Sequence, residues 1–155
     1  MASRRVPHLI ETGSRAPNLR LPLLDKGEAD LSELIAGGPI LLAFFKVTCP
    51  VCQLTLPYLD RIHAAGRLKI YAISQNEPED TREFNEHFRL HMPTLLDPGK
   101  DGYPASNAFG ISSVPTMFLI EPDGTISQAI EGWRKKEIAG WGAQVPEGVP
   151  EWKAG

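Results

Sequence analysis

The sequence predicts an α/β sandwich with a mixed central sheet, and three features of the chain support this fold class. An apolar run over residues 40–45 has the pattern of a strand that is buried on both faces. Strand-like and helix-like segments then alternate along the chain, as they do where helices cover a sheet. Residues 116–121 and 125–130 flank Pro122-Asp123-Gly124, which predicts a hairpin that adds antiparallel strands.

The chain before this apolar strand predicts little regular structure. Residues 1–29 contain three prolines and no helical period, so we expect an extended segment with turns and a short edge strand near 18–21. Asp30 has the residue type of a helix N-cap for 31–36, and Gly37-Gly38 would end that helix.

The elements after the apolar strand follow from proline, glycine and apolar spacing. A helix is predicted from about Cys49 to Gly66 with Pro57 inside it, and another helix opens at Pro78 with acidic residues in its first turn. The other predicted elements are strands at 68–73 and 94–96, helices at 103–109 and 135–141, and a loosely held tail at 143–155.

The composition of the chain limits the classes of protein to which it can belong. The 155 residues suit one domain, 1–155, which we expect to be a monomer. A net charge of -3 with no basic stripe argues against nucleic-acid binding. No apolar stretch reaches the roughly 18 residues of a membrane span. We expect a cytoplasmic protein as the sequence stands, or a periplasmic or other extracytoplasmic one if a targeting segment was removed.

The two cysteines form one motif, Cys49-Pro50-Val51-Cys52. A disulfide across so small a loop would stabilise the fold by only about 2 kcal/mol, so the spacing favours chemistry over a structural link. At a strand-to-helix junction, free N–H groups and the helix dipole point at the first sulfur and favour its thiolate. We predict that Cys49 attacks a substrate disulfide and that Cys52, one turn along, resolves the mixed disulfide. Pro50 suits the first helical turn.

Two other interpretations of the cysteines carry less weight. A structural zinc site needs four ligands, and His63, His87 and His91 match no familiar ligand spacing, so we predict no metal. Incidental cysteines remain an alternative, because short motifs also occur by chance.

The motif and its surroundings resemble the thioredoxin-like superfamily, and more narrowly the TlpA/ResA-type redoxins of the AhpC/TSA-redoxin group. The resemblance spans about 13–133. Its carriers, in chain order, are Leu41-Leu42-Ala43-Phe44-Phe45, the cysteine motif, Pro57, Pro93-Thr94-Leu95-Leu96-Asp97, Phe109-Gly110-Ile111, Val114-Pro115-Thr116-Met117-Phe118-Leu119-Ile120, Asp123-Gly124 and Gly132.

The resemblance implies a thioredoxin-like three-layer α/β/α sandwich, with the redoxin-type inserted helix and strand between Gln75 and Asn107. Pro115 would be a cis-proline that faces the cysteine pair and keeps metal ions away from the thiolates. Val114 would offer its backbone to an extended substrate segment. The resemblance implies no cofactor other than the redox-active Cys49–Cys52 disulfide. The implied partners are protein dithiols or disulfides and an unknown redox partner.

Three positions depart from the pattern of these relatives. Thr48 stands where relatives commonly have Trp, which narrows the apolar platform beside the first sulfur. Ala43 replaces a buried Asp of thioredoxin, and Thr55 replaces the Glu of many ResA-like members. The usual proton acceptor for Cys52 is therefore missing. Lys46, a water or another group could replace it, although Lys46 also fits a solvated lysine at a strand end.

We predict a thiol–disulfide oxidoreductase that reduces protein disulfides, and two alternatives stay open. The first is a thiol peroxidase of the peroxiredoxin type, whose motif has Thr three residues before the reactive cysteine and Pro four before that Thr. Counting back gives Lys46 and Leu42 from Cys49, or Cys49 and Phe45 from Cys52, so neither frame fits. The second is a non-catalytic thioredoxin-fold binding module or a Cu(I)-handling protein, because two thiolates can hold Cu(I).

Overall fold

The computed structural model describes residues 9–155, so the first part of the predicted extended segment lies outside the described residues. In chain order the elements are β1 (Arg20–Pro22), β2 (Glu28–Asp30), α1 (Leu31–Ala36), β3 (Ile40–Phe45), α2 (Pro50–Ala64), β4 (Lys69–Ser74), α3 (Pro78–His87), β5 (Thr94–Leu96), a 3-10 turn (Gly99–Asp101), α4 (Pro104–Phe109), β6 (Thr116–Ile120), β7 (Ile126–Glu131), β8 (Trp133–Arg134), α5 (Lys135–Gly140) and β9 (Trp152–Lys153).

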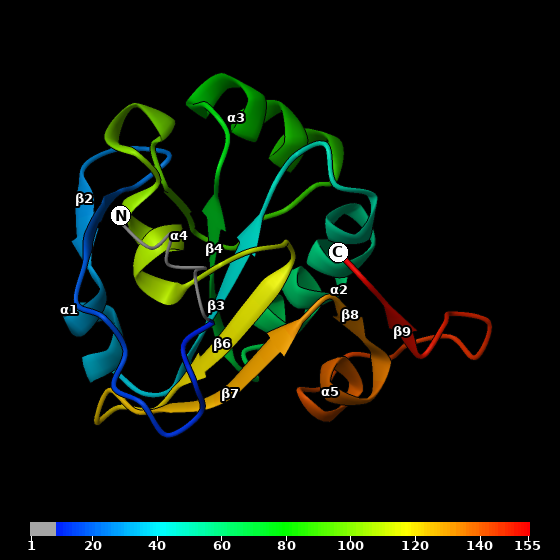
Figure 1. The fold of residues 1–155 in the computed structure, drawn as a ribbon. Coiled ribbons are helices and arrows are strands. Elements are labelled where there is room, and N and C mark those ends of the chain that lie inside the picture. Colours follow the sequence, from blue (N-terminus) through cyan, green and yellow to red (C-terminus); the bar gives the residue numbers. More distant parts are fainter. Residues whose placement is uncertain (1–8) are drawn as a thin grey trace, which may run out of the picture.

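The central sheet has five strands in the order β5-β4-β3-β6-β7, with the apolar strand β3 in the middle (Figure 1). β3 runs parallel to β4 and antiparallel to β6, so the sheet is mixed. Every residue of β3 is buried, as expected for a strand covered on both faces. The mixed α/β sheet predicted from the sequence is confirmed.

Aromatic contacts on β3 show that helices cover both faces of the sheet. The ring of Phe44 packs against Phe109 of α4 and Phe118 of β6, with centroids 5.4 and 5.9 Å away. The next residue, Phe45, packs against Phe84 of α3 at 5.1 Å. Successive strand residues point to opposite faces, so α4 and α3 lie on opposite sides of β3. This is the three-layer arrangement predicted from the sequence.

The inserted segment adds an edge strand and is fixed by a buried carboxylate. β5 pairs parallel with β4, and Asp97 follows it at full burial. The two carboxylate oxygens of Asp97 accept hydrogen bonds from the backbone N–H groups of Ala105 and Ser106, both at 2.8 Å, and one of them also accepts from the Ser106 hydroxyl. Asp97 therefore satisfies free donors at the start of α4.

The chain from 143 to 155 differs from the loosely held tail that its Pro and Gly content favoured. β9 pairs antiparallel with β8, and the indole N–H of the buried Trp133 donates to the Pro150 carbonyl at 2.6 Å. The Lys135 ammonium donates to the carbonyl oxygens of Glu147 and Val149. These partners lie more than ten residues away in sequence, so local composition could not reveal them.

Candidate active site

Cys49 lies at the N-terminus of α2, between the end of β3 and the first helical turn. It is the N-cap of the helix, with extended backbone angles, and Pro50 occupies the first helical position. The Cys49 sulfur accepts a hydrogen bond from the backbone N–H of Cys52 at 3.1 Å. The side chain is half-buried, so a disulfide can still approach the sulfur. A free helical N–H aimed at sulfur stabilises negative charge on it.

Cys52 lies one turn deeper and is fully buried. Burial raises the pKa of the Cys52 thiol well above its ordinary value, the hydrogen bond with Cys49 raises it further, and the nearby Lys46 backbone and ammonium oppose the rise. Both cysteines are free thiols in the structure. The pair thus combines an accessible sulfur at a helix N-terminus with a shielded thiol that stays protonated.

Hydrogen bonds from neighbouring elements fix the loop that carries Cys49. The backbone N–H of Val47 donates to the Asn76 side-chain oxygen at 2.9 Å, and the Gln53 amide donates to the Val47 carbonyl at 3.0 Å. The Cys49 N–H donates to the Lys46 carbonyl at 3.2 Å. Neither Gln53 nor Asn76 has a signal in the sequence, because the partner of both is a backbone group that only the fold brings near.

The segment at Val114 and Pro115 closes the other side of Cys49. The peptide bond between these residues is cis. The thiol of Cys49 donates to the Val114 carbonyl oxygen at 3.4 Å across 65 residues of sequence. The Pro115 carbonyl is already used, since it accepts from the Gly132 N–H at 2.8 Å. The Val114 carbonyl is therefore the backbone acceptor that faces the Cys49 sulfur.

The other residues that the sequence pointed to lie around this arrangement. Thr48 and Pro50 flank Cys49 and are exposed, so both are accessible to an approaching substrate. Lys46 is exposed at the end of β3. Thr55 is buried and donates its hydroxyl to the Val51 carbonyl at 2.7 Å. It is thus occupied within the helix.

The described residues, 9–155, contain no group of three or more His, Cys, Asp or Glu side chains placed to hold a metal ion. Across the same residues, no helix is both long and apolar enough to cross a membrane.

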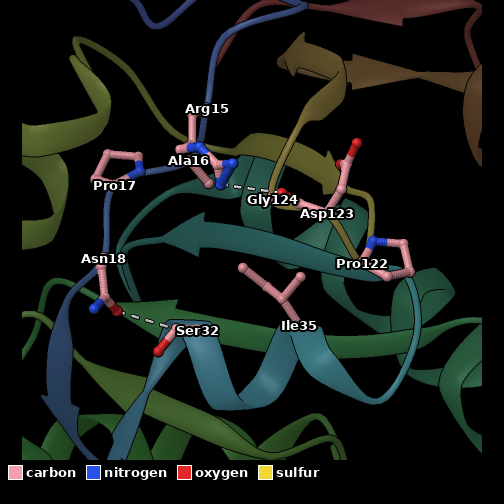
Figure 2. Close-up of a pocket in the computed structure, with 9 residues that line it drawn as sticks. All are labelled: Arg15, Ala16, Pro17, Asn18, Ser32, Ile35, Pro122, Asp123 and Gly124. Carbon is pink, nitrogen blue, oxygen red and sulfur yellow. Dashed lines mark hydrogen bonds between the residues drawn. The ribbon is translucent and has the colours of Figure 1, made fainter.

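A pocket of mixed polar and apolar lining lies at the other end of β3, away from the cysteines. The loop after β6 forms part of the pocket, and the end of β6 pairs with the first residue of β3. Cys49 instead follows the last residue of β3. Figure 2 shows two hydrogen bonds between residues that line the pocket: the Arg15 guanidinium donates to the Asp123 carbonyl at 3.1 Å, and the Asn18 side-chain oxygen accepts from the Ser32 N–H at 3.4 Å. None of the predicted site residues lines it.

Comparisons with known proteins identify the family of this chain. The chain matches the model of the AhpC/TSA family over residues 12–129. It is 30% identical over 132 residues to the thiol-disulfide oxidoreductase ResA of Geobacillus kaustophilus, covering 83% of this chain and 74% of that protein. ResA of Bacillus subtilis is 27% identical over 127 residues, covering 79% and 69%.

Solved structures show the same fold. The thioredoxin domain of a thiol-disulfide oxidoreductase from Bacteroides vulgatus superposes with a TM-score of 0.75 at 23% identity, covering 84% of this chain and 94% of that one. The fold and the cysteine pair define a redoxin with a thioredoxin-like fold. The chain belongs to the AhpC/TSA family, and within it to the TlpA/ResA-type redoxins. The class of enzyme predicted from the sequence, a thiol–disulfide oxidoreductase, is confirmed.

Proposed function

We propose that this protein reduces disulfides of other proteins, with Cys49 as the nucleophile and Cys52 as the resolving thiol. The observation that carries the proposal is the difference between the two sulfurs. Cys49 is half-buried and accepts a helical N–H, whereas Cys52 is fully buried and its thiol pKa is raised by that burial. An accessible sulfur with stabilised negative charge is suited to attack.

The proposed cycle consists of two thiol–disulfide displacements. The Cys49 thiolate attacks one sulfur of the substrate disulfide, forms a mixed disulfide and releases the other substrate sulfur as a thiolate, which takes up a proton. Cys52 then loses its proton and attacks the Cys49 sulfur, which releases the second substrate thiol. The substrate gains two electrons, and the enzyme is left with a Cys49–Cys52 disulfide. A dithiol donor must reduce this disulfide before the next turnover.

Val114 supports binding of an extended substrate segment in this proposal. Its carbonyl oxygen lies 3.4 Å from the Cys49 sulfur, so a backbone N–H bound there would hold the neighbouring disulfide near the nucleophile. Backbone pairing of this kind gives affinity without demanding one substrate sequence. Thr48, Pro50 and Pro115 complete the proposed contact surface around Cys49.

Insulin reduction with dithiothreitol as the electron donor tests the proposal. The wild-type protein should accelerate the reaction, Cys49→Ser should abolish the acceleration, and Cys52→Ser should accumulate a mixed disulfide that sodium dodecyl sulfate gels without reductant resolve. Consumption of hydrogen peroxide without insulin reduction would support the peroxidase alternative. Retention of Cu(I) by both thiols without turnover would support the binding module.

A further inference from the structure

The last residues of the described chain run from β8 to the active site. β9, at Trp152–Lys153, pairs with β8, and the Glu151 carbonyl accepts a hydrogen bond from the Lys135 N–H at 3.0 Å. In Figure 1 the red C-terminal segment leaves β9 and ends beside α2, the helix that begins after Cys49. A segment distant in sequence therefore lies at the cysteine pair.

Gly155 lies directly against the Val114 carbonyl. A Cβ atom added to Gly155 would overlap the Val114 carbonyl oxygen, and it would lie 2.6 Å from the carbonyl carbon and 3.2 Å from the Pro115 nitrogen. No side chain fits in that direction, so the glycine backbone itself rests on this surface. The same carbonyl oxygen lies 3.4 Å from the Cys49 sulfur.

This position coincides with the one that an extended substrate would need. A protein segment that pairs with Val114 beside Cys49 has to approach the same carbonyl that Gly155 covers. Two backbones cannot occupy one edge position together, since a backbone pair already brings strands to about 4.8 Å. The segment 152–155 and the substrate therefore compete.

We propose that residues 152–155 form an intramolecular strap over the Val114 edge, which an extended protein substrate must displace and a small disulfide need not. The strap is thus an element that determines specificity, and this inference rests on the proposed disulfide exchange at Cys49. A small disulfide reaches the half-buried sulfur without pairing with Val114. A protein segment reaches it only in the open state of the strap.

The contacts of the strap are suited to opening. The chain up to Glu151 is fixed by the Trp133 indole at Pro150 and by the Lys135 N–H at Glu151. All five residues from 151 to 155 are exposed, with Trp152 at 57%. Beyond the Glu151 anchor, the strap is held by the two-residue pairing of β9 with β8 and buries little apolar area, so opening costs little free energy.

Ending the chain at Glu151 tests the strap. This deletion removes 152–155 and keeps the Pro150 and Glu151 backbone contacts. The value of kcat/KM for insulin should rise about three- to tenfold, because a site that is open in a minority of molecules loses apparent affinity in proportion. The second-order rate with 5,5′-dithiobis(2-nitrobenzoic acid), a small disulfide, should stay unchanged.

Two glycine substitutions give a matched pair within the full-length chain. Gly155→Ala places a methyl group against the Val114 carbonyl, so it should displace the strap and raise the insulin rate as the deletion does. Gly148→Ala lies in the same tail with open space around the added carbon, so it should leave the rate unchanged. Melting temperatures of all variants check that the fold is retained.

An unchanged or lower insulin rate in the deletion variant, with the small-disulfide rate retained, would overturn the strap. A parallel rise with both substrates would also overturn it, since the strap would then not discriminate by size. If the wild-type protein reacts with neither disulfide, the failure lies with the proposed function and not with the strap.

Discussion

Cys49 and Cys52 are three residues apart, yet they occupy different surroundings. Cys49 is half-buried at the first turn of α2 and accepts the Cys52 N–H, whereas the Cys52 side chain is fully buried within the helix. The raised pKa of the Cys52 thiol follows chiefly from that burial. These differences suit the two residues to the distinct roles that we propose for them.

Alkylation at pH 7 should distinguish the two thiols. Iodoacetamide should modify Cys49 at least about tenfold faster than Cys52, because the reagent needs both access and thiolate. Peptide mapping by mass spectrometry after partial reaction measures the ratio. The Cys49→Ser variant should remain almost unmodified over the same time. Equal modification of both residues would show that Cys52 is neither shielded nor held as a thiol.

The resolving step should depend steeply on pH. The pKa of Cys52 is raised, so this group stays protonated at neutral pH, and its thiolate fraction grows about tenfold per pH unit below the pKa. Reaction with 5,5′-dithiobis(2-nitrobenzoic acid) releases one thiolate when Cys49 attacks and a second when Cys52 resolves. The rate of the second phase should therefore rise throughout pH 6 to 9.

The Cys52→Ser variant is the control for that measurement, because it should show the first phase alone. A second phase that reaches a plateau below pH 7 would contradict a raised Cys52 pKa.

At the scale of elements, buried polar contacts fix the segments around the site. The carboxylate of Asp97 serves the N-terminus of α4 through the N–H groups of Ala105 and Ser106. Gln53 and Asn76 hold the loop between β3 and α2 through Val47. Each of these contacts joins residues that are apart in sequence. Together they fix the inserted segment and the loop that carries Cys49.

Asp97→Ala should destabilise the protein by about 3 kcal/mol, because it leaves two buried backbone N–H groups without an acceptor. Urea unfolding followed by circular dichroism measures the change. Asp101→Ala, at an exposed position in the neighbouring 3-10 turn, is the matched control and should change the free energy of unfolding by about 0.5 kcal/mol or less. Equal stability of both variants would show that the Asp97 contacts contribute nothing.

The elements with a strong local signal were predictable from the sequence, and those defined by distant partners were not. The apolar run of β3 and the hairpin of β6 and β7 have patterns that only strands satisfy well. β2, β8 and β9 have two or three residues each, which is too short for any periodicity, and they exist because a partner strand lies beside them.

The same distinction applies to the active site. The cysteine motif and its place before α2 follow from spacing and from Pro50 at the first helical position. The Val114 region was predicted only from the resemblance to a family, because no local pattern in the sequence connects it to Cys49. No pattern in the sequence predicted the strap over Val114, because its residues have the composition that is usual for an unstructured tail.

At the scale of the whole molecule, the five-stranded sheet brings three separate segments to one end. The loop after β3 carries Cys49, the loop before β6 carries Val114, and the segment after β9 covers Val114. The proposed nucleophile, the proposed substrate-binding edge and the strap therefore lie together in space, although no two of them are neighbours in sequence. The fold thus provides both the thiol chemistry and a means to restrict access to it.

In the proposed function, Cys49 and Cys52 form the reversible redox pair of a reductase. Equilibration of the protein against dithiothreitol buffers of graded potential, followed by alkylation and mass spectrometry, measures its reduction potential directly. We predict a single two-electron transition near about -270 mV, the value typical of a thioredoxin-like reductant. A potential near about -120 mV would contradict the reducing direction. Failure of the two sulfurs to form a disulfide at any potential would contradict the account as a whole.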